Sequence, residues 1–238
     1  MRPFPPARRI AALAVVLLAL LASRLFAADL YQVSTIGALS AGLYEGRERF
    51  ASLARHGDFG LGTFANLDGE MVAVDGAFYQ ARSDGTVHRV APAEKTPFAQ
   101  VVFFSGALDL GRVDGLTFEA LKTTLAGRLP DPDKFYAVRV DGRFPAITVR
   151  SVVAQPKPWP TLADAVKGQK VFPLQNVRGS LVGIYTPSGA SAISPPGWHF
   201  HFISLDRTRG GHVLEATLGP AKARGDVVTT MRIAFPEH

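Results

Sequence analysis

The 238-residue sequence contains no cysteine, which excludes disulfide bonds and thiolate metal ligands. Any metal site must therefore use nitrogen and oxygen ligands. Four of the 26 Lys and Arg residues, and none of the 20 acidic residues, lie in residues 1–28, so the remainder carries a formal charge of 22 − 20, or +2. The remainder also has no basic cluster, which removes the electrostatic argument for nucleic-acid binding.

Residues 1–28 have the segment order of a secretory signal peptide. Several arginines precede an apolar run of 13 residues at 10–22, and the small residues Ala27 and Ala28 follow it. A membrane-spanning helix needs about 20 apolar residues. The run therefore favours a cleaved leader, with an uncleaved N-terminal anchor as the alternative. We expect cleavage after Ala27 or Ala28, export to the periplasm or the medium, and no stable membrane span afterwards.

Residues 29–238 are expected to form one strand-rich α+β domain with mixed or antiparallel sheets and a few short helices. Short apolar segments alternate with turn residues, most clearly at Asp141-Gly142, which predicts a β-hairpin turn. The segment 117–129 has apolar residues at helical spacing and predicts the clearest helix. Three prolines within 154–161 mark a candidate internal boundary.

Three of the six histidines fall within 14 positions near the C-terminus. On a predicted strand His199 and His201 share one face, about 6.6 Å apart along it. Turn residues follow at 206–211, and the chain returns in a strand that begins with His212. Pairing of the two strands as a hairpin would bring three imidazoles together. Three protein ligands leave a position open, which is the arrangement of catalytic zinc sites.

The histidine pattern by itself does not define one class of protein. Each histidine alone is better interpreted as a hydrogen-bonded or solvated strand residue, and we assign His56 and His88 to that class. Cupins and carbonic anhydrases also use His-x-His pairs. A cupin would need a glutamate soon after the second histidine, where this chain has Asp206. The third histidine also follows more closely than is usual in carbonic anhydrases. The motif thus indicates a zinc Lewis acid without naming a reaction.

The sequence also contains eight short segments in a characteristic order. They are Tyr31–Ile36, Gly57–Phe64, Leu67–Glu70, Lys95–Ala99, Phe135–Val138, Gly183–Pro187, His199–Ile203 and Gly210–Leu214. In this order they resemble the acetolactate decarboxylase family, over nearly the whole of residues 30–236. No single segment is decisive, whereas the ordered set is specific.

This resemblance implies that the protein converts (S)-2-acetolactate to (R)-acetoin and CO2. It implies that His199, His201 and His212 bind Zn2+, and that the zinc stabilises an enediolate protonated on one face. It also implies a homodimer.

The resemblance further implies that Glu70, Arg150 and Thr63 are active-site residues. Without it, Glu70 would be taken as a solvated turn carboxylate, Arg150 as a strand arginine facing solvent or an acid, and Thr63 as an ordinary strand residue. Family members often continue into a tail with a further glutamate. The sequence leaves open whether Glu237 takes that role.

Two other functions stay open. The protein could be another exported zinc lyase or hydrolase that uses zinc-bound water, which would need a general base aimed at that water. It could also be a non-catalytic zinc-binding or sensory protein on the same scaffold, whose function would not depend on Glu70 or Arg150.

Overall fold

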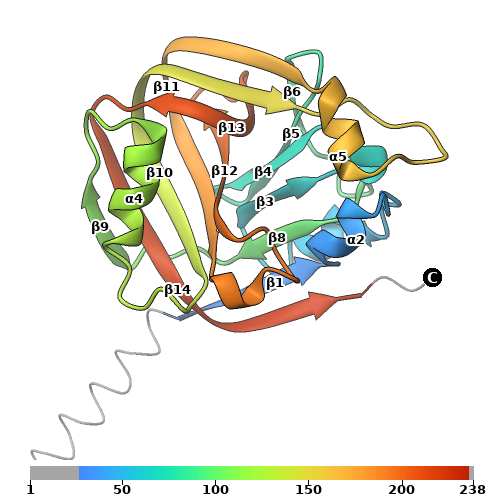
Figure 1. Cartoon of the computed structure of the whole chain (residues 1–238), viewed down its shortest axis with the longest axis horizontal. Coiled ribbons are helices and arrows are strands. Elements are labelled where there is room, and N and C mark those ends of the chain that lie inside the picture. The colour runs from blue at the N-terminus through green and yellow to red at the C-terminus, as the bar shows by residue number, and fades with distance from the viewer. Residues whose placement is uncertain (1–26, 236–238) are drawn as a thin grey trace, which may run out of the picture.

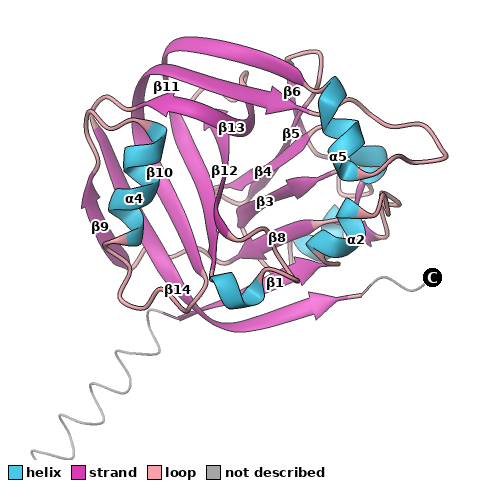
Figure 2. Cartoon of the chain, in the orientation of Figure 1, coloured by secondary structure: helices cyan, strands magenta, loops and turns pink. Residues whose placement is uncertain are grey.

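The computed structural model describes residues 27–235. Most of the predicted leader, and Glu237, lie outside the described residues. Within them a 12-stranded sheet dominates, and the helices are short (Figures 1 and 2). The predicted strand-rich α+β class is confirmed.

The sheet contains strands of very different lengths. They are β1 (Ala27–Val33), β3 (Phe59–Thr63), β4 (Glu70–Val74), β5 (Ala77–Ala81), β6 (Val87–Arg89), β8 (Ala99–Val102), β9 (Leu108–Arg112), β10 (Tyr136–Ser151), β11 (Lys170–Thr186), β12 (Gly197–Ser204), β13 (Gly210–Thr217) and β14 (Ala221–Ala234). A separate pair joins β2 (Glu48–Arg49) to β7 (Lys95–Thr96).

The helical segments are brief. They are α2 (Ile36–Ser40), α3 (Phe50–Leu53), α4 (Phe118–Ala126) and α5 (Leu162–Ala165), with 3-10 turns η1 (Ala65–Leu67), η2 (Val166–Gly168) and η3 (Ser188–Ala190). The helix expected at 117–129 is confirmed as α4, although it is shorter. Thr117 caps its N-terminus, because the hydroxyl accepts from the Ala120 backbone N–H at 3.3 Å.

The strand order is β11-β12-β13-β10-β14-β1-β8-β3-β4-β5-β6, with β9 on β14. Because β10 pairs with β11 as well as with β13, the four strands β10 to β13 close on themselves. β1 runs parallel to β14, whereas the other pairs along this order are antiparallel, so the sheet is mixed.

The two faces of β12 pack into different cores. Phe200 and Phe202 lie in one apolar cluster together with Leu121 of α4. Ile203 points to the other side, into a cluster with Leu61 and residues of β4. This alternation follows from the two-residue period of a strand, and it leaves the neighbouring histidines on the face directed at β4.

The hairpin turn predicted at Asp141-Gly142 is wrong. β10 runs without interruption through both residues, which pair with β11 on one side and β14 on the other. A Cβ atom at Gly142 would lie 2.4 Å from the Cβ of Ala221. The glycine therefore serves the close approach of β14 rather than a turn.

The proline-rich segment 154–161 is part of the connection from β10 to β11, which also contains α5 and η2. These two strands pair with each other from Tyr136–Tyr185 to Ser151–Lys170. The chain on both sides of the segment thus belongs to the same sheet.

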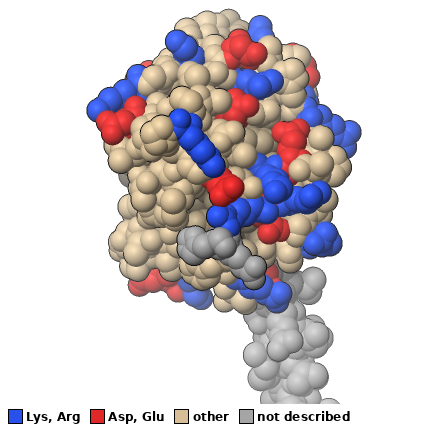
Figure 3. Space-filling model, turned by 90° about the vertical axis from the view of Figure 1, so that its right-hand side faces the viewer, with Lys and Arg blue, Asp and Glu red and all other residues tan. Residues whose placement is uncertain are grey.

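The surface carries charges of both signs. On the face shown in Figure 3, which is the right-hand side of Figure 1, basic and acidic side chains lie beside one another. No helix within residues 27–235 is long and apolar enough to cross a membrane.

Candidate active site

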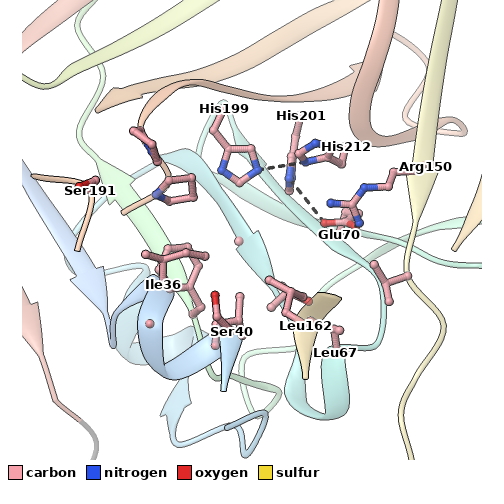
Figure 4. Close-up of a pocket in the computed structure, with 18 of the residues that line it drawn as sticks. Ile36, Ser40, Leu67, Glu70, Arg150, Leu162, Ser191, His199, His201 and His212 are labelled. Atoms are coloured by element: carbon pink, nitrogen blue, oxygen red, sulfur yellow. Dashed lines mark hydrogen bonds and ion pairs between the residues drawn. The ribbon is translucent and has the colours of Figure 1, made fainter. Parts of the chain in front are cut away.

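The predicted histidine hairpin is formed by β12 and β13. These strands are antiparallel, and His201 lies directly opposite His212. His199 precedes His201 by two residues and so shares its face. Ligand atoms of the three imidazoles all lie within 4.8 Å of one another (Figure 4). The structure therefore brings together the three residues that the sequence singled out.

The nitrogen atoms of this cluster suit a metal ion. The Nδ1 of His201 lies 2.7 Å from the carbonyl oxygen of Met71, which can only accept, so Nδ1 carries the proton and Nε2 keeps its lone pair. That Nε2 is buried and has no hydrogen-bond partner in the described part of the chain. His199 Nε2 and His212 Nδ1 are 3.0 Å apart. Two nitrogens bound at about 2.0–2.1 Å to one tetrahedral ion would lie about 3.3 Å apart.

Burial keeps the three imidazoles neutral. Desolvation lowers the pKa of His201 to about 3, and the Arg150 charge adds to this. Desolvation likewise holds the pKa of His199 and of His212 well below the ordinary histidine value, and neighbouring imidazoles and Arg150 contribute. Neutral imidazole is the form that binds metal.

A buried ion pair lies beside the imidazoles. Arg150 Nη1 donates to Glu70 Oε1 at 2.9 Å, and the two side chains are only 16% and 7% exposed. Glu70 Oε2 is 3.5 Å from His201 Nε2. Burial raises the pKa of Glu70, although Arg150 and a backbone N–H group at Val152 oppose this effect.

The sheet explains how these residues meet. Arg150 on β10 lies opposite His212 on β13, while Glu70 is the first residue of β4. The default interpretation of Glu70 as a solvated turn carboxylate does not hold, because the residue is 5% exposed. For Arg150 the default interpretation left solvent or an acid open, and the structure shows the acid, Glu70, in the interior.

Thr63 supports the turn that precedes Glu70. It pairs with Glu70 across β3 and β4, and its hydroxyl donates to the Gly69 carbonyl oxygen at 2.7 Å. The residue is 4% exposed and lines the same cavity as the histidines. Thr63 thus lies at the site, where its visible contact holds the backbone next to Glu70.

Comparison with known proteins gives a consistent result. Residues 30–238 match the family model described as alpha-acetolactate decarboxylase. The chain belongs to the alpha-acetolactate decarboxylase family. It is accordingly a carboxy-lyase, and the resemblance drawn from the eight segments is confirmed.

Relatives in the alpha-acetolactate decarboxylase family cover most of the chain. The enzyme of Methanosarcina mazei is 42% identical over 207 residues, which are 87% of this chain and 72% of that protein. The enzyme of Bacillus subtilis is 40% identical over 191 residues, 80% of this chain and 74% of that protein. A crystal structure of the Bacillus subtilis enzyme matches with a TM-score of 0.86 at 37% identity, covering 88% of this chain and 90% of that chain.

The candidate site lies in a cavity of about 630 Å³. The rest of the cavity is mainly apolar, and its walls come from α2, α5, the segment before β12 and the turn after β3 (Figure 4). No sequence motif marks these residues as cavity walls, although Ile36 and Leu67 belong to two of the eight ordered segments. The wall residues include Ile36, Leu39, Ser40, Leu67, Leu162, Ser191 and Trp198. Apart from Trp198, which adjoins His199, none belongs to a motif with recognisable chemistry.

Proposed function

We propose that the protein uses Zn2+ to convert (S)-2-acetolactate to (R)-acetoin and CO2. The observation that carries this proposal is the convergence of three neutral imidazoles, of which His201 is buried and the other two are half-buried, with the Glu70–Arg150 pair in a mainly apolar cavity. Histidine sets accept several divalent ions, and zinc is the choice that the three-histidine arrangement favours.

The substrate carries its carboxylate β to a ketone. When CO2 leaves, the electron pair of the broken C–C bond moves toward the ketone oxygen. His199, His201 and His212 would hold the zinc ion, which would supply a Lewis acid for the negative charge at that oxygen. No organic cofactor is then required.

Arg150 binds and orients the substrate in this proposal. Its guanidinium has five N–H donors, and Glu70 occupies one of them in the structure. The planar group can therefore hold substrate oxygens through other donors while Glu70 fixes its orientation. The apolar walls exclude water, which strengthens each of these electrostatic contacts.

Glu70 manages the proton that replaces CO2. Burial raises the pKa of its carboxyl group above the ordinary value, which makes it a better proton carrier than an exposed carboxylate. Because Glu70 and Arg150 are fixed on one side of the cavity, the proton reaches only one face of the carbon. The product should therefore be a single enantiomer.

Chiral analysis of the product tests the proposal most directly. Purified protein with a measured zinc content should turn acetolactate into acetoin in which the R form strongly predominates. Racemic acetoin would mean that the intermediate escapes into water before protonation, and would contradict the roles given to Glu70 and Arg150. Activity on simple esters without acetoin formation would favour a hydrolase that uses zinc-bound water.

Alanine variants test the metal site separately. His199→Ala, His201→Ala and His212→Ala should each abolish tight zinc binding and acetoin formation, as elemental analysis and activity assays would show. His56→Ala and His88→Ala serve as controls, since neither residue lines the cavity. Stoichiometric zinc in a His199→Ala, His201→Ala double variant would rule out this site.

A further inference from the structure

One wall of the catalytic cavity is the segment 187–196, which connects β11 to β12. Ser191, Pro195 and Pro196 of this segment line the cavity. The segment leads within three residues to His199, and the two prolines restrict its backbone at that point. Its position therefore affects the space for substrate.

Three completely buried polar side chains hold this wall segment. Gln32 on β1 lies directly opposite Gln100 on β8, and both residues, like Ser194 in the wall segment, are 0% exposed. The Ser194 hydroxyl donates to Gln32 Oε1 at 2.5 Å. The Gln100 amide donates to Gln32 Oε1 at 2.8 Å and to Ser194 Oγ at 3.0 Å.

The same cluster joins the wall segment to α2. The carbonyl oxygen of Ile193 accepts from the Gln32 amide at 3.0 Å and from the backbone N–H of Ile36 at 2.9 Å. Ile36 is the first residue of α2, and it lines the cavity together with Leu39 and Ser40 of that helix. Figure 4 shows Ser191 and Ile36 on the side of the cavity away from Arg150.

Stability alone does not explain a polar cluster at this place. The Gln100 Oε1 atom is buried and has no hydrogen-bond partner within residues 27–235. A buried network that leaves an acceptor unsatisfied is costlier than well-packed apolar side chains. What the cluster offers instead is a defined position for the backbone of the wall segment.

We propose that Gln32, Gln100 and Ser194 are positioning residues that hold the segment 187–196 and α2 together as one wall of the cavity, and that they thereby set the affinity for the 2-hydroxy-3-keto acid. The identity of the substrate rests on the proposed function. The mechanical part, that the three side chains hold the wall, does not depend on it.

Two variants test the proposal. Ser194→Ala removes the hydroxyl, and Gln100→Met replaces the amide with an apolar side chain of similar length. Each should raise the KM for acetolactate about three- to tenfold, the effect of losing one or two buried hydrogen bonds. The kcat should stay within about twofold, since the groups that meet the substrate are unchanged. Hydrogen–deuterium exchange of the amides at 187–196 should become faster, at unchanged zinc content.

Ser180→Ala is the matched control. Ser180 is also buried and its hydroxyl donates to Asp141 at 2.6 Å, but it lines a different cavity. Its variant should keep the wild-type KM and the wild-type exchange rates at 187–196.

The outcomes separate the two proposals. Wild-type exchange rates and a wild-type KM in Ser194→Ala would overturn the positioning role. If Gln100→Met does not fold, the milder Ser194→Ala variant by itself tests that role. A loss confined to kcat would also overturn it. If the wild-type protein forms no acetoin, the proposed substrate is wrong, while the exchange measurement still decides whether the cluster holds the wall.

Discussion

Glu70 and Arg150 form a charge pair in the interior, where each needs the other. Removing one partner of such a pair leaves a buried charge unpaired, which commonly costs about 3–5 kcal/mol. Conservative replacements are therefore the sharper test, because they keep the volume and change the chemistry.

Arg150→Lys and Glu70→Gln should retain zinc and lose activity. Lysine lacks the planar fork that can hold Glu70 and a substrate oxygen together, and glutamine cannot deliver a proton. We expect kcat/KM for acetoin formation to fall about a hundredfold or more, with zinc content unchanged by elemental analysis. If both variants had a rate near that of the wild-type protein, the roles given to Glu70 and Arg150 would be contradicted. Only the alternative of a general zinc lyase would then fit.

The buried histidines also predict how stability depends on pH in metal-free protein. The pKa of His201 is about 3 in the folded state, against 6.5 for an ordinary histidine side chain, and those of His199 and His212 are lowered in the same direction. Between these values the unfolded chain binds more protons than the folded chain, so the free energy of unfolding rises with pH. The raised pKa of Glu70 makes the free energy of unfolding fall with pH above the ordinary value of 4.5. This is the effect of a single group, whereas three histidines act in the opposite direction.

Urea unfolding of metal-free protein at several pH values between 4 and 6.5 checks this expectation. Stability should increase across the interval, and a His201→Phe variant should show a smaller increase. A flat profile would mean that the imidazoles are not buried in the metal-free protein. In zinc-loaded protein the same protonation should release the metal as the pH falls.

At the scale of elements, β10 shows how a turn-like dipeptide can belong to a continuous strand. Asp-Gly favours a hairpin locally, but at Gly142 the neighbouring strand β14 approaches too closely for any side chain. The packing requirement overrides the turn preference.

Gly142→Ala should therefore destabilise the protein. The new methyl group would meet Ala221 Cβ at 2.4 Å and the Pro220 carbonyl oxygen at 2.7 Å, and such overpacking costs about 1–3 kcal/mol. Gly168→Ala is the matched control, because a Cβ there would have nothing within 4 Å. That variant should be neutral, or more stable by up to about 1 kcal/mol. Equal unfolding midpoints in urea for the two variants would contradict the close approach of β14.

At the scale of the whole molecule, β1 lies inside the sheet, between β14 and β8. Its second residue, Ala28, is 6% exposed and pairs with Val228. Removal of Ala28 would take a buried side chain from the edge of the core. Of the two expected cleavage sites, the one after Ala27 leaves Ala28 in place and so keeps its pairing with Val228.

We propose that the leader is removed and that the exported protein begins at Ala28, with Asp29 as the neighbouring start. Mass spectrometry of protein recovered from the cell envelope or the medium would identify the first residue. Intact Met1 on membrane-bound protein would instead support the N-terminal anchor. The homodimer also remains a prediction, which sedimentation equilibrium of the mature protein would check.

Local sequence was enough to predict the histidine hairpin. Alternation of His199, Phe200 and His201, followed by turn residues and a second strand, depends only on the two-residue period and on turn chemistry. The same holds for α4, whose apolar spacing is local. The identity of the family could also be seen in the order of short segments.

Only the tertiary structure decided which distant segments of the chain lie together. Glu70 and Arg150 are 80 residues apart, and neither residue has a local signal that marks it as buried. The cavity walls from α2 and 187–196, and the uninterrupted course of β10, depend on which strands pair. Strand pairing is selected by the burial of apolar surface over the whole chain and by the room between backbones, as at Gly142, and neither quantity is contained in a short stretch of sequence.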